Sequence, residues 1–234
     1  MQDEIKLEKI LFLDIETAPV TYQYKDLSKE TKALWDKKWM YNESESPEER
    51  YKKAGIYAEF AKVVCISMGN FHNGKFYVKS FASEDEKHLL ELVIEHLNKF
   101  YSSDDSNLCA HNGKEFDFPF LCRRMLINKM KLPKILNISG KKPWEVKLLD
   151  TLEMWKFGDY KSYTSLDLLA HTFNLPSPKG EIDGSDVARV FWEDKDLELL
   201  KTYCGKDVIT LASIYCLITG KEAILDEQLI FATL

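Results

Sequence analysis

Apolar residues fill both alternating faces of the segment KILFLDIE, residues 9–16, until Asp14 interrupts them. A strand that is apolar on both faces is typical of the centre of a sheet covered by helices on each side. Residues 63–68 and 75–81 are also strand-like, and they flank an Asn-Gly dipeptide at 73–74 that favours a tight hairpin turn. We therefore expect a central strand followed in the chain by an antiparallel hairpin.

Helical segments are indicated by capping signals and by the spacing of apolar residues. SPEE at 46–49 and SEDE at 83–86 have the pattern of a capping box, in which Ser and Glu side chains satisfy backbone N–H groups at the start of a helix. Further helices are expected at about 118–130, 165–173 and 196–219. Gly220 follows the last of these and is a typical helix stop.

Short strands are expected at 107–111 and 147–149, so that strands and helices alternate after the hairpin. This order favours a three-layer α/β fold, with a mixed five-stranded sheet, its first three strands antiparallel, between helices. Residues 19–45 are rich in charged and aromatic side chains and are expected to be irregular, with a short helix near Trp35 and Trp39. We expect residues 1–234 to form a single domain with an inserted segment at about 19–60.

The composition is that of a globular protein, with 45% hydrophobic and 30% charged residues among 234. The start of the chain lacks the pattern of a signal peptide, and no apolar run is long enough to span a membrane. The five cysteines are odd in number and widely spaced, so neither a disulfide framework nor a zinc site is indicated. We expect a cytoplasmic protein without membrane contact, and nothing in the sequence predicts a protein partner.

The net charge of −6 at first argues against a nucleic-acid partner. Acidic residues that hold divalent cations are neutralised by them, however, so the formal charge overstates the working charge. The charge is also uneven, because residues 123–147 contain eight basic residues and one acidic residue. This stretch, with Trp144, is a candidate for contacting phosphates and stacking a base, and the alternative is a solvated lysine-rich loop.

Asp14 and Glu16 are two residues apart on the first strand, so their side chains point to the same face. We expect them at the carboxyl end of that strand, where α/β sheets place their ligands. Two neighbouring carboxylates repel each other, and a divalent cation with its preference for oxygen ligands removes that conflict. The alternative is a strand end that runs into solvent.

Two later acids are further candidates. Asp117 precedes Phe118 and Pro119, and it is either a ligand aimed at the sheet or a simple helix N-cap. Asp207 interrupts an apolar stripe on the long C-terminal helix, and Tyr203 lies one turn earlier on the same face. A buried carboxylate is costly unless it finds a partner, so Asp207 either binds a cation or accepts hydrogen bonds at the edge of the stripe.

Three segments resemble the motifs of DnaQ-like 3′–5′ exonucleases. FLDIET at 12–17 is similar to the first motif, and HNGKEFD at 111–117, followed by FPFL, is similar to the second. YCGKD at 203–207 has the Tyr-x-x-x-Asp pattern of the DEDDy subgroup, and Thr202 stands where the DEDDh subgroup has His. Three motifs in the family's order make the resemblance specific.

The resemblance extends beyond these motifs. Residues 59–66 and 179–185 are similar to segments of the predicted exonucleases related to the proofreading domain of family B DNA polymerases, and the similarity covers about residues 8–220. It implies an RNase H-like fold. It also implies removal of nucleotides from the 3′ end of single-stranded nucleic acid, with DNA favoured over RNA.

The same resemblance assigns the site residues. It implies that two divalent cations, Mg²⁺ or Mn²⁺, are held by Asp14, Glu16, Asp117 and Asp207, with Asp14 bridging both. Two such cations, roughly 4 Å apart, activate the attacking water and stabilise the leaving oxygen. Tyr203 has an ordinary pKa of about 10, so we expect it to orient the water more than to deprotonate it. The candidate substrate-binding residues are Thr17, Asn112 and Phe116.

Two other classes of function are considered. FLDIET also resembles, loosely, the Asp-x-Asp-x-Thr strand end of HAD-like phosphatases, but Glu16 fits that pattern poorly and Asp117 and Asp207 are then unexplained. The other alternative is a catalytically silent nucleic-acid-binding module. Metal-dependent digestion of an oligonucleotide separates these alternatives from a nuclease.

Overall fold

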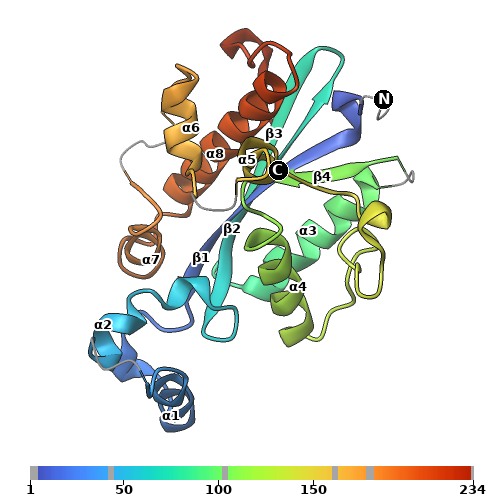
Figure 1. Ribbon diagram of the computed structural model, residues 1–234. Coiled ribbons are helices and arrows are strands. Elements are labelled where there is room, and N and C mark those ends of the chain that lie inside the picture. The colour runs from blue at the N-terminus through green and yellow to red at the C-terminus, as the bar shows by residue number, and fades with distance from the viewer. Residues whose placement is uncertain (1–4, 42–44, 102–104, 160–162, 178–181, 233–234) are drawn as a thin grey trace.

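The computed structural model describes residues 5–41, 45–101, 105–159, 163–177 and 182–232. Within these ranges, six strands form one mixed sheet in the order β5-β4-β1-β2-β3-β6, with helices on both faces (Figure 1). The strands β1, β2 and β3 are antiparallel neighbours, as predicted, whereas β4 and β5 run in the direction of β1 and β6 runs parallel to β3. The bounds are β1 Ile10–Pro19, β2 Ala61–His72, β3 Lys75–Ala82, β4 Asn107–Ala110, β5 Leu148–Asp150 and β6 Leu229–Phe231.

The hairpin of β2 and β3 turns at Asn73 and Gly74, whose φ angles are 49° and 72°. Positive φ at both central residues is the turn geometry that Asn-Gly favours, so the predicted hairpin is confirmed. The expected strand count of five was wrong, because Leu229–Phe231 adds β6 beside β3. Three residues are too few to show the alternation by which a strand is recognised in a sequence.

Helices divide between the two faces of the sheet (Figure 1). The helices α3, Glu86–Phe100, and α4, Asp117–Ile127, pack on the face of β1 that carries Leu11 and Leu13. The long helix α8, Leu197–Ile218, covers the opposite face, where it contacts Ile10 and Phe12. This division follows from the strand geometry, since neighbouring residues of β1 point to opposite faces.

The remaining helices are short. They are α1 Lys29–Lys38, α2 Pro47–Tyr51, α5 Thr151–Lys156, α6 Leu166–Thr172 and α7 Val187–Arg189. Single 3₁₀ turns occupy Leu7–Lys9, Tyr24–Asp26, Ala54–Ile56, Pro143–Glu145 and Asp226–Gln228, and a π-helical turn occupies Val190–Asp194. No helix in the described ranges combines the length and the apolar character that crossing a membrane requires.

One of the two expected capping boxes differs from the prediction. Ser46 caps α2 as expected, with its hydroxyl accepting the N–H of Glu49 at 3.2 Å. The cap of α3 is Asp85 instead of Ser83, and its carboxylate accepts the N–H of Lys87 at 3.0 Å. The reason is that Glu86 turns into the interior, where it pairs with an arginine of α4, and is not available to fold back on the first turn.

The inserted segment has a small aromatic core of its own. Trp35 is fully buried, and its ring centroid lies 5.3 Å from that of Tyr51 and 5.0 Å from that of Phe60. Trp35 lies in α1, as expected, and Trp39 follows its last turn. The helices α1 and α2 project from one end of the molecule, beyond the carboxyl end of β1 (Figure 1).

Candidate active site

The two acids of the first motif lie within β1 instead of at its end. β1 pairs with the parallel strand β4 only as far as Phe12, whereas its antiparallel pairing with β2 continues to Pro19. Asp14 and Glu16 therefore follow the end of the parallel ladder, on the face of β1 that α8 covers. The expectation of a strand end was wrong because β2 continues to satisfy the backbone of β1 beyond the acids.

A β-bulge separates the acids from Thr17. The register of β1 against β2 shifts between Glu16 and Thr17. The hydroxyl of Thr17 donates a 2.7 Å hydrogen bond to the carbonyl oxygen of Gly55, at the end of the inserted segment. Thr17 consequently lines a cavity beside the acids and not the cavity that the acids themselves line.

Asp117 is the first residue of α4 and is buried, with 4% of its surface exposed. The position before the helix is Phe116, so the side chain of Asp117 is not the N-cap that the alternative proposed. The backbone N–H of Ile15, between the two acids of β1, instead lies near the carboxylate of Asp117 and opposes the rise of its pKa. The chain reaches this position through a close turn, since a Cβ on Gly113 would lie 2.3 Å from that of Ala110.

Asp150 supports this turn and was missed by the sequence analysis. It is the last residue of β5, and its carboxylate accepts the backbone N–H of Asn112 at 2.9 Å and that of Lys114 at 3.0 Å. The only signal in the sequence is an apolar strand that ends in Asp, which is the feature that singled out Asp14. The expected strand at 147–149 was located correctly to within one residue.

The long helix α8 brings the third motif to the acids of β1. Asp207 is buried and Tyr203 is half-buried on the same face, one turn apart. Between them, the thiol of Cys204 lies 3.4 Å from both the backbone oxygen and a carboxylate oxygen of Asp14. Ligand atoms of Asp14, Glu16 and Cys204 all lie within 4.8 Å of one another.

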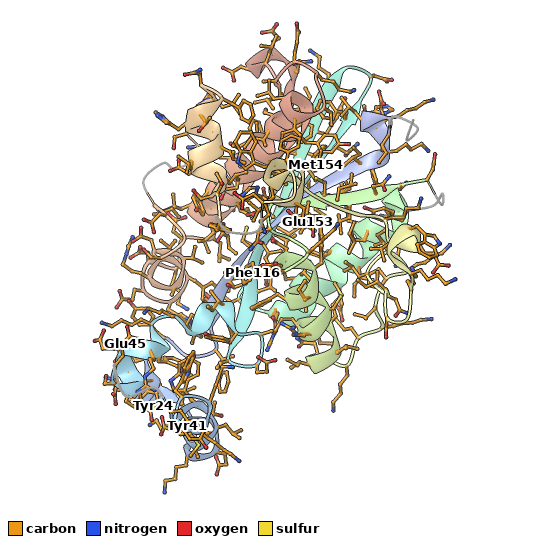
Figure 2. The ribbon with its side chains drawn as sticks, in the orientation of Figure 1. Tyr24, Tyr41, Glu45, Phe116, Glu153 and Met154 are labelled. Atoms are coloured by element: carbon orange, nitrogen blue, oxygen red, sulfur yellow. The ribbon has the colours of Figure 1, made fainter. Side chains whose placement is uncertain are left out.

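The four predicted acids share one cavity of about 360 Å³. Figure 2 shows Phe116, which lines it, near the centre of the molecule. His111 also lines the cavity, but both of its ring nitrogens are engaged, with Thr151 and with the backbone oxygen of Thr164, each at 2.9 Å. The predicted site residues that line the cavity are Asp14, Glu16, Asn112, Phe116, Asp117, Tyr203 and Asp207, joined by Ile15, Ile56, His111, Tyr163, Leu166 and Gly184.

Burial and mutual repulsion make this cluster costly to ionise. Burial, followed by the charges of neighbouring acids, raises the pKa of Asp14 and of Glu16 well above the ordinary values. Burial also raises the pKa of Asp117, to about 7, although the nearby backbone N–H groups of Asp117 and Ile15 oppose the shift. A set of hard oxygen donors with this conflict fits divalent cations, which favour the ionised form of each carboxylate.

The phenol of Tyr203 is kept protonated by the same surroundings. Burial raises its pKa above the ordinary value, and the charges of Asp207 and Glu16 add to the shift. A phenol in this state donates a hydrogen bond and does not serve as a base.

The basic stretch 123–147 lies elsewhere. Within the described part of the chain, none of its residues lines the acid cavity. Arg124 is buried and forms an ion pair with Glu86, at 2.6 Å, inside the layer of α3 and α4. Trp144 is 74% exposed, with the ammonium group of Lys142 lying 5.2 Å from the centre of its ring.

Comparison with solved structures finds the same fold in a DNA polymerase. The family B DNA polymerase from the hyperthermophilic archaeon Pyrobaculum calidifontis matches 87% of this chain with a TM-score of 0.51 and 16% sequence identity. The match covers 24% of the polymerase chain. This likeness shows the fold, which is the expected RNase H-like α/β class.

Comparison by sequence is more restricted. No curated protein matches the chain. A family model matches residues 56–231, which include Asp117, Tyr203 and Asp207. Asp14 and Glu16 precede the matched segment. They lie on β1, which pairs with β2 inside that segment. The chain belongs to the family of predicted 3′–5′ exonucleases related to the exonuclease domain of PolB.

Proposed function

We propose that this protein is a metal-dependent 3′–5′ exonuclease that hydrolyses phosphodiester bonds at the 3′ end of single-stranded nucleic acid, with DNA favoured over RNA. The observation that carries the proposal is the convergence of four carboxylates from three distant segments in one cavity. The family supplies the polarity of the reaction. We also propose that residues 1–234 act as a single catalytic domain with an insertion at about 19–60.

The donor set fits two divalent cations, Mg²⁺ or Mn²⁺. The proposed ligands are Asp14, Glu16, Asp117 and Asp207. Asp14 would contact both cations, as the resemblance of FLDIET at 12–17 to the first exonuclease motif implies. Bound at such a site, a pair of cations activates water and stabilises the leaving oxygen of an in-line displacement.

Tyr203 is proposed to orient the attacking water through its hydroxyl. Its raised pKa keeps the proton on the phenol, so the hydroxyl acts as a hydrogen-bond donor and acceptor. One turn of helix separates it from Asp207, which places the water beside a metal ligand.

Asn112 and Phe116 are the proposed contacts to the terminal nucleotide. Both are partly exposed in the acid cavity, and the ring of Phe116 is backed by Phe120 at 5.4 Å between centroids. An aromatic face supported in this way suits a stacked base. Thr17 is proposed to contact the substrate from the adjoining cavity, where its side chain lies.

The deciding experiment is digestion of single-stranded DNA and RNA of one sequence, labelled at either end, with and without Mn²⁺. A 3′–5′ exonuclease releases the 3′ label first, as mononucleotides, and only with the cation. Binding without cleavage would favour the silent nucleic-acid-binding module. Phosphate release from a small phosphomonoester, with the oligonucleotide intact, would favour the phosphatase.

A further inference from the structure

A second and larger cavity adjoins the one that holds the acids. Its volume is about 950 Å³. One wall is formed by the inserted segment, from Pro19 to Lys25 and from Glu48 to Ile56, and the other by residues 184–193 around α7. Ile56 and Gly184 line both cavities, so the two adjoin at these residues.

A hydrogen bond joins the two walls of this second cavity. The indole N–H of Trp192 donates to the backbone oxygen of Pro19 at 2.9 Å. The phenol of Tyr22 lies close to the carboxylate of Glu193, which raises the pKa of Tyr22 after the larger effect of burial. The inserted segment is therefore attached to the helical segment that precedes α8, and the cavity between them is part of the fold.

The charge of the lining is opposite to that of the whole chain. Four basic residues line the cavity against two acidic ones, Glu48 and Glu193, although the chain carries a net charge of −6. The basic residues are Lys25, Lys52, Lys53 and Arg189. Lys52 and Lys53 are exposed, and their ion pairs with glutamates are of the surface kind that contributes little and exchanges readily for a phosphate.

Aromatic side chains alternate with these cations. Tyr22, Tyr24 and Tyr51 line the cavity, and Figure 2 shows Tyr24 within the inserted segment. Tyr22 and Tyr24 are partly exposed, whereas Tyr51 is buried and supports the ring of Tyr24 at 6.1 Å between centroids, with Trp35 behind it at 5.3 Å. Rigid aromatic faces beside mobile cations are the combination that binds single strands with little sequence preference.

We infer that this cavity holds the nucleotides that precede the scissile bond, so that a single strand runs along the inserted segment and passes Ile56 and Gly184 to reach the carboxylates. The inference rests on the proposed function. The length of strand that is recognised is then set by the inserted segment, which forms one wall of the cavity.

The test compares substrates that reach one cavity or both. The p-nitrophenyl ester of thymidine 5′-monophosphate reaches the acids alone, whereas oligonucleotides of about 4 to 12 residues extend into the second cavity. We expect kcat/KM to rise with length and then to level off. In the variant Lys52→Ala/Lys53→Ala, the ratio of kcat/KM for the longest strand to that for the ester should fall about tenfold, and the salt dependence should weaken.

The matched control is Lys29→Ala/Lys37→Ala, which removes the same charge from α1 at positions outside the cavity lining. This variant should keep the wild-type ratio. The inference would be overturned if the kcat/KM ratio fell equally in the two double variants. It would also be overturned if kcat/KM did not depend on strand length, or if the protein preferred a blunt duplex.

A binding measurement distinguishes failure of this inference from failure of the proposed function. Fluorescence anisotropy of a labelled oligonucleotide in EDTA measures occupancy of the cavity without catalysis. If the wild-type protein binds the strand through Lys52 and Lys53 but shows no hydrolysis, the proposed nuclease activity is refuted and the proposed strand path is supported. If the ester is hydrolysed but Lys52→Ala/Lys53→Ala leaves the anisotropy unchanged, the nuclease activity is supported and the proposed strand path is refuted.

Discussion

The carboxylate of Asp150 holds the backbone of Asn112 by a hydrogen bond of 2.9 Å. Its other oxygen holds Lys114 at 3.0 Å, so the end of β5 is tied to the turn that follows β4. That turn leads directly into α4, whose first residue is Asp117. Asp150, which does not line the acid cavity, thus sets the position of Asp117, which does.

Replacing Asp150 should therefore reduce both stability and activity. Asp150→Ala leaves four backbone N–H groups without this acceptor, those of Asn112, Lys114, Leu152 and Glu153. We expect the free energy of unfolding to fall by about 2–4 kcal/mol, since each lost acceptor costs about 1–3 kcal/mol and water compensates in part. Asp150→Asn keeps one acceptor oxygen, so its stability and activity should lie between those of the wild type and those of Asp150→Ala. Urea denaturation and the nuclease assay measure the two effects; full activity in Asp150→Ala would contradict the positioning role.

Removing an acid from the cavity should abolish activity without weakening the fold. Asp14→Asn deletes a charge that burial and neighbouring acids already disfavour, so the metal-free protein should melt at the same or a higher temperature. Its nuclease activity should be lost. The control is Glu115→Gln, an exposed acid in the turn before α4, which should leave both quantities unchanged. Substantial activity in Asp14→Asn would refute the assignment of ligands.

Tyr203→Phe should slow turnover while leaving cation binding intact. The substitution removes only the hydroxyl, and the ring keeps its place on α8 beside Leu200 and Cys204 in the same apolar cluster. We expect kcat to fall about tenfold or more, in the range typical of a lost positioning group. Calorimetric titration with Mn²⁺ should give the same affinity as the wild type. An unchanged kcat would exclude any role for the phenol in orienting water.

Much of this arrangement follows from local patterns. The apolar faces of β1, the Asn-Gly turn and the helical stripe of α8 each depend on neighbouring residues, and each appears in the structure where the spacing predicts it. Asp14 and Asp207 were conspicuous because each interrupts an apolar pattern, and a charge in such a position needs a partner. The apolar patterns left an alternative open for each acid, and the resemblance to three ordered motifs was what grouped Asp14, Glu16, Asp117 and Asp207 into one expected site.

The features that were missed depend on residues far apart in the chain. Glu86 fails to complete its capping box because Arg124, 38 residues later, draws it inward. Thr17 lies in the second cavity, where its hydroxyl is bound to Gly55, and Asp150 acts on a turn 38 residues earlier. The second cavity exists only where the inserted segment meets α7. Spacing along the sequence carries no sign of these contacts.

The buried pair of Glu86 and Arg124 yields a prediction for stability alone. Glu86 accepts from the guanidinium group at 2.8 and 2.6 Å and from the N–H of Val63 at 2.8 Å, and Arg124 donates to the backbone oxygen of Ala58 at 2.7 Å. Glu86→Gln leaves the guanidinium without its counter-charge and should cost about 3–5 kcal/mol. Adding Arg124→Met should recover part of this loss in a double-mutant cycle. Additive effects would show that the two side chains are not coupled.

The stability of the metal-free protein should depend on pH through Asp117. Its pKa is raised from 3.8 to about 7 in the folded state, so between these values the native protein holds a proton that the unfolded chain has released. The free energy of unfolding contributed by this group therefore falls as pH rises through that window, by a total on the order of a few kcal/mol. Burial lowers the pKa of His96 and of His111 from 6.5, which has the opposite effect on stability as pH rises toward that value.

The informative quantity is consequently the difference in the free energy of unfolding between the wild type and Asp117→Asn. Thermal denaturation in EDTA from about pH 5 to pH 8 should show the wild type losing stability relative to the variant. Mn²⁺ should reverse this loss in the wild type above about pH 7, because the cation binds the ionised carboxylates and stabilises the folded state in proportion to its occupancy. A difference that stays flat across the range, or that grows in favour of the wild type in EDTA, would show that Asp117 is ionised at no cost to the fold and has no need of a cation.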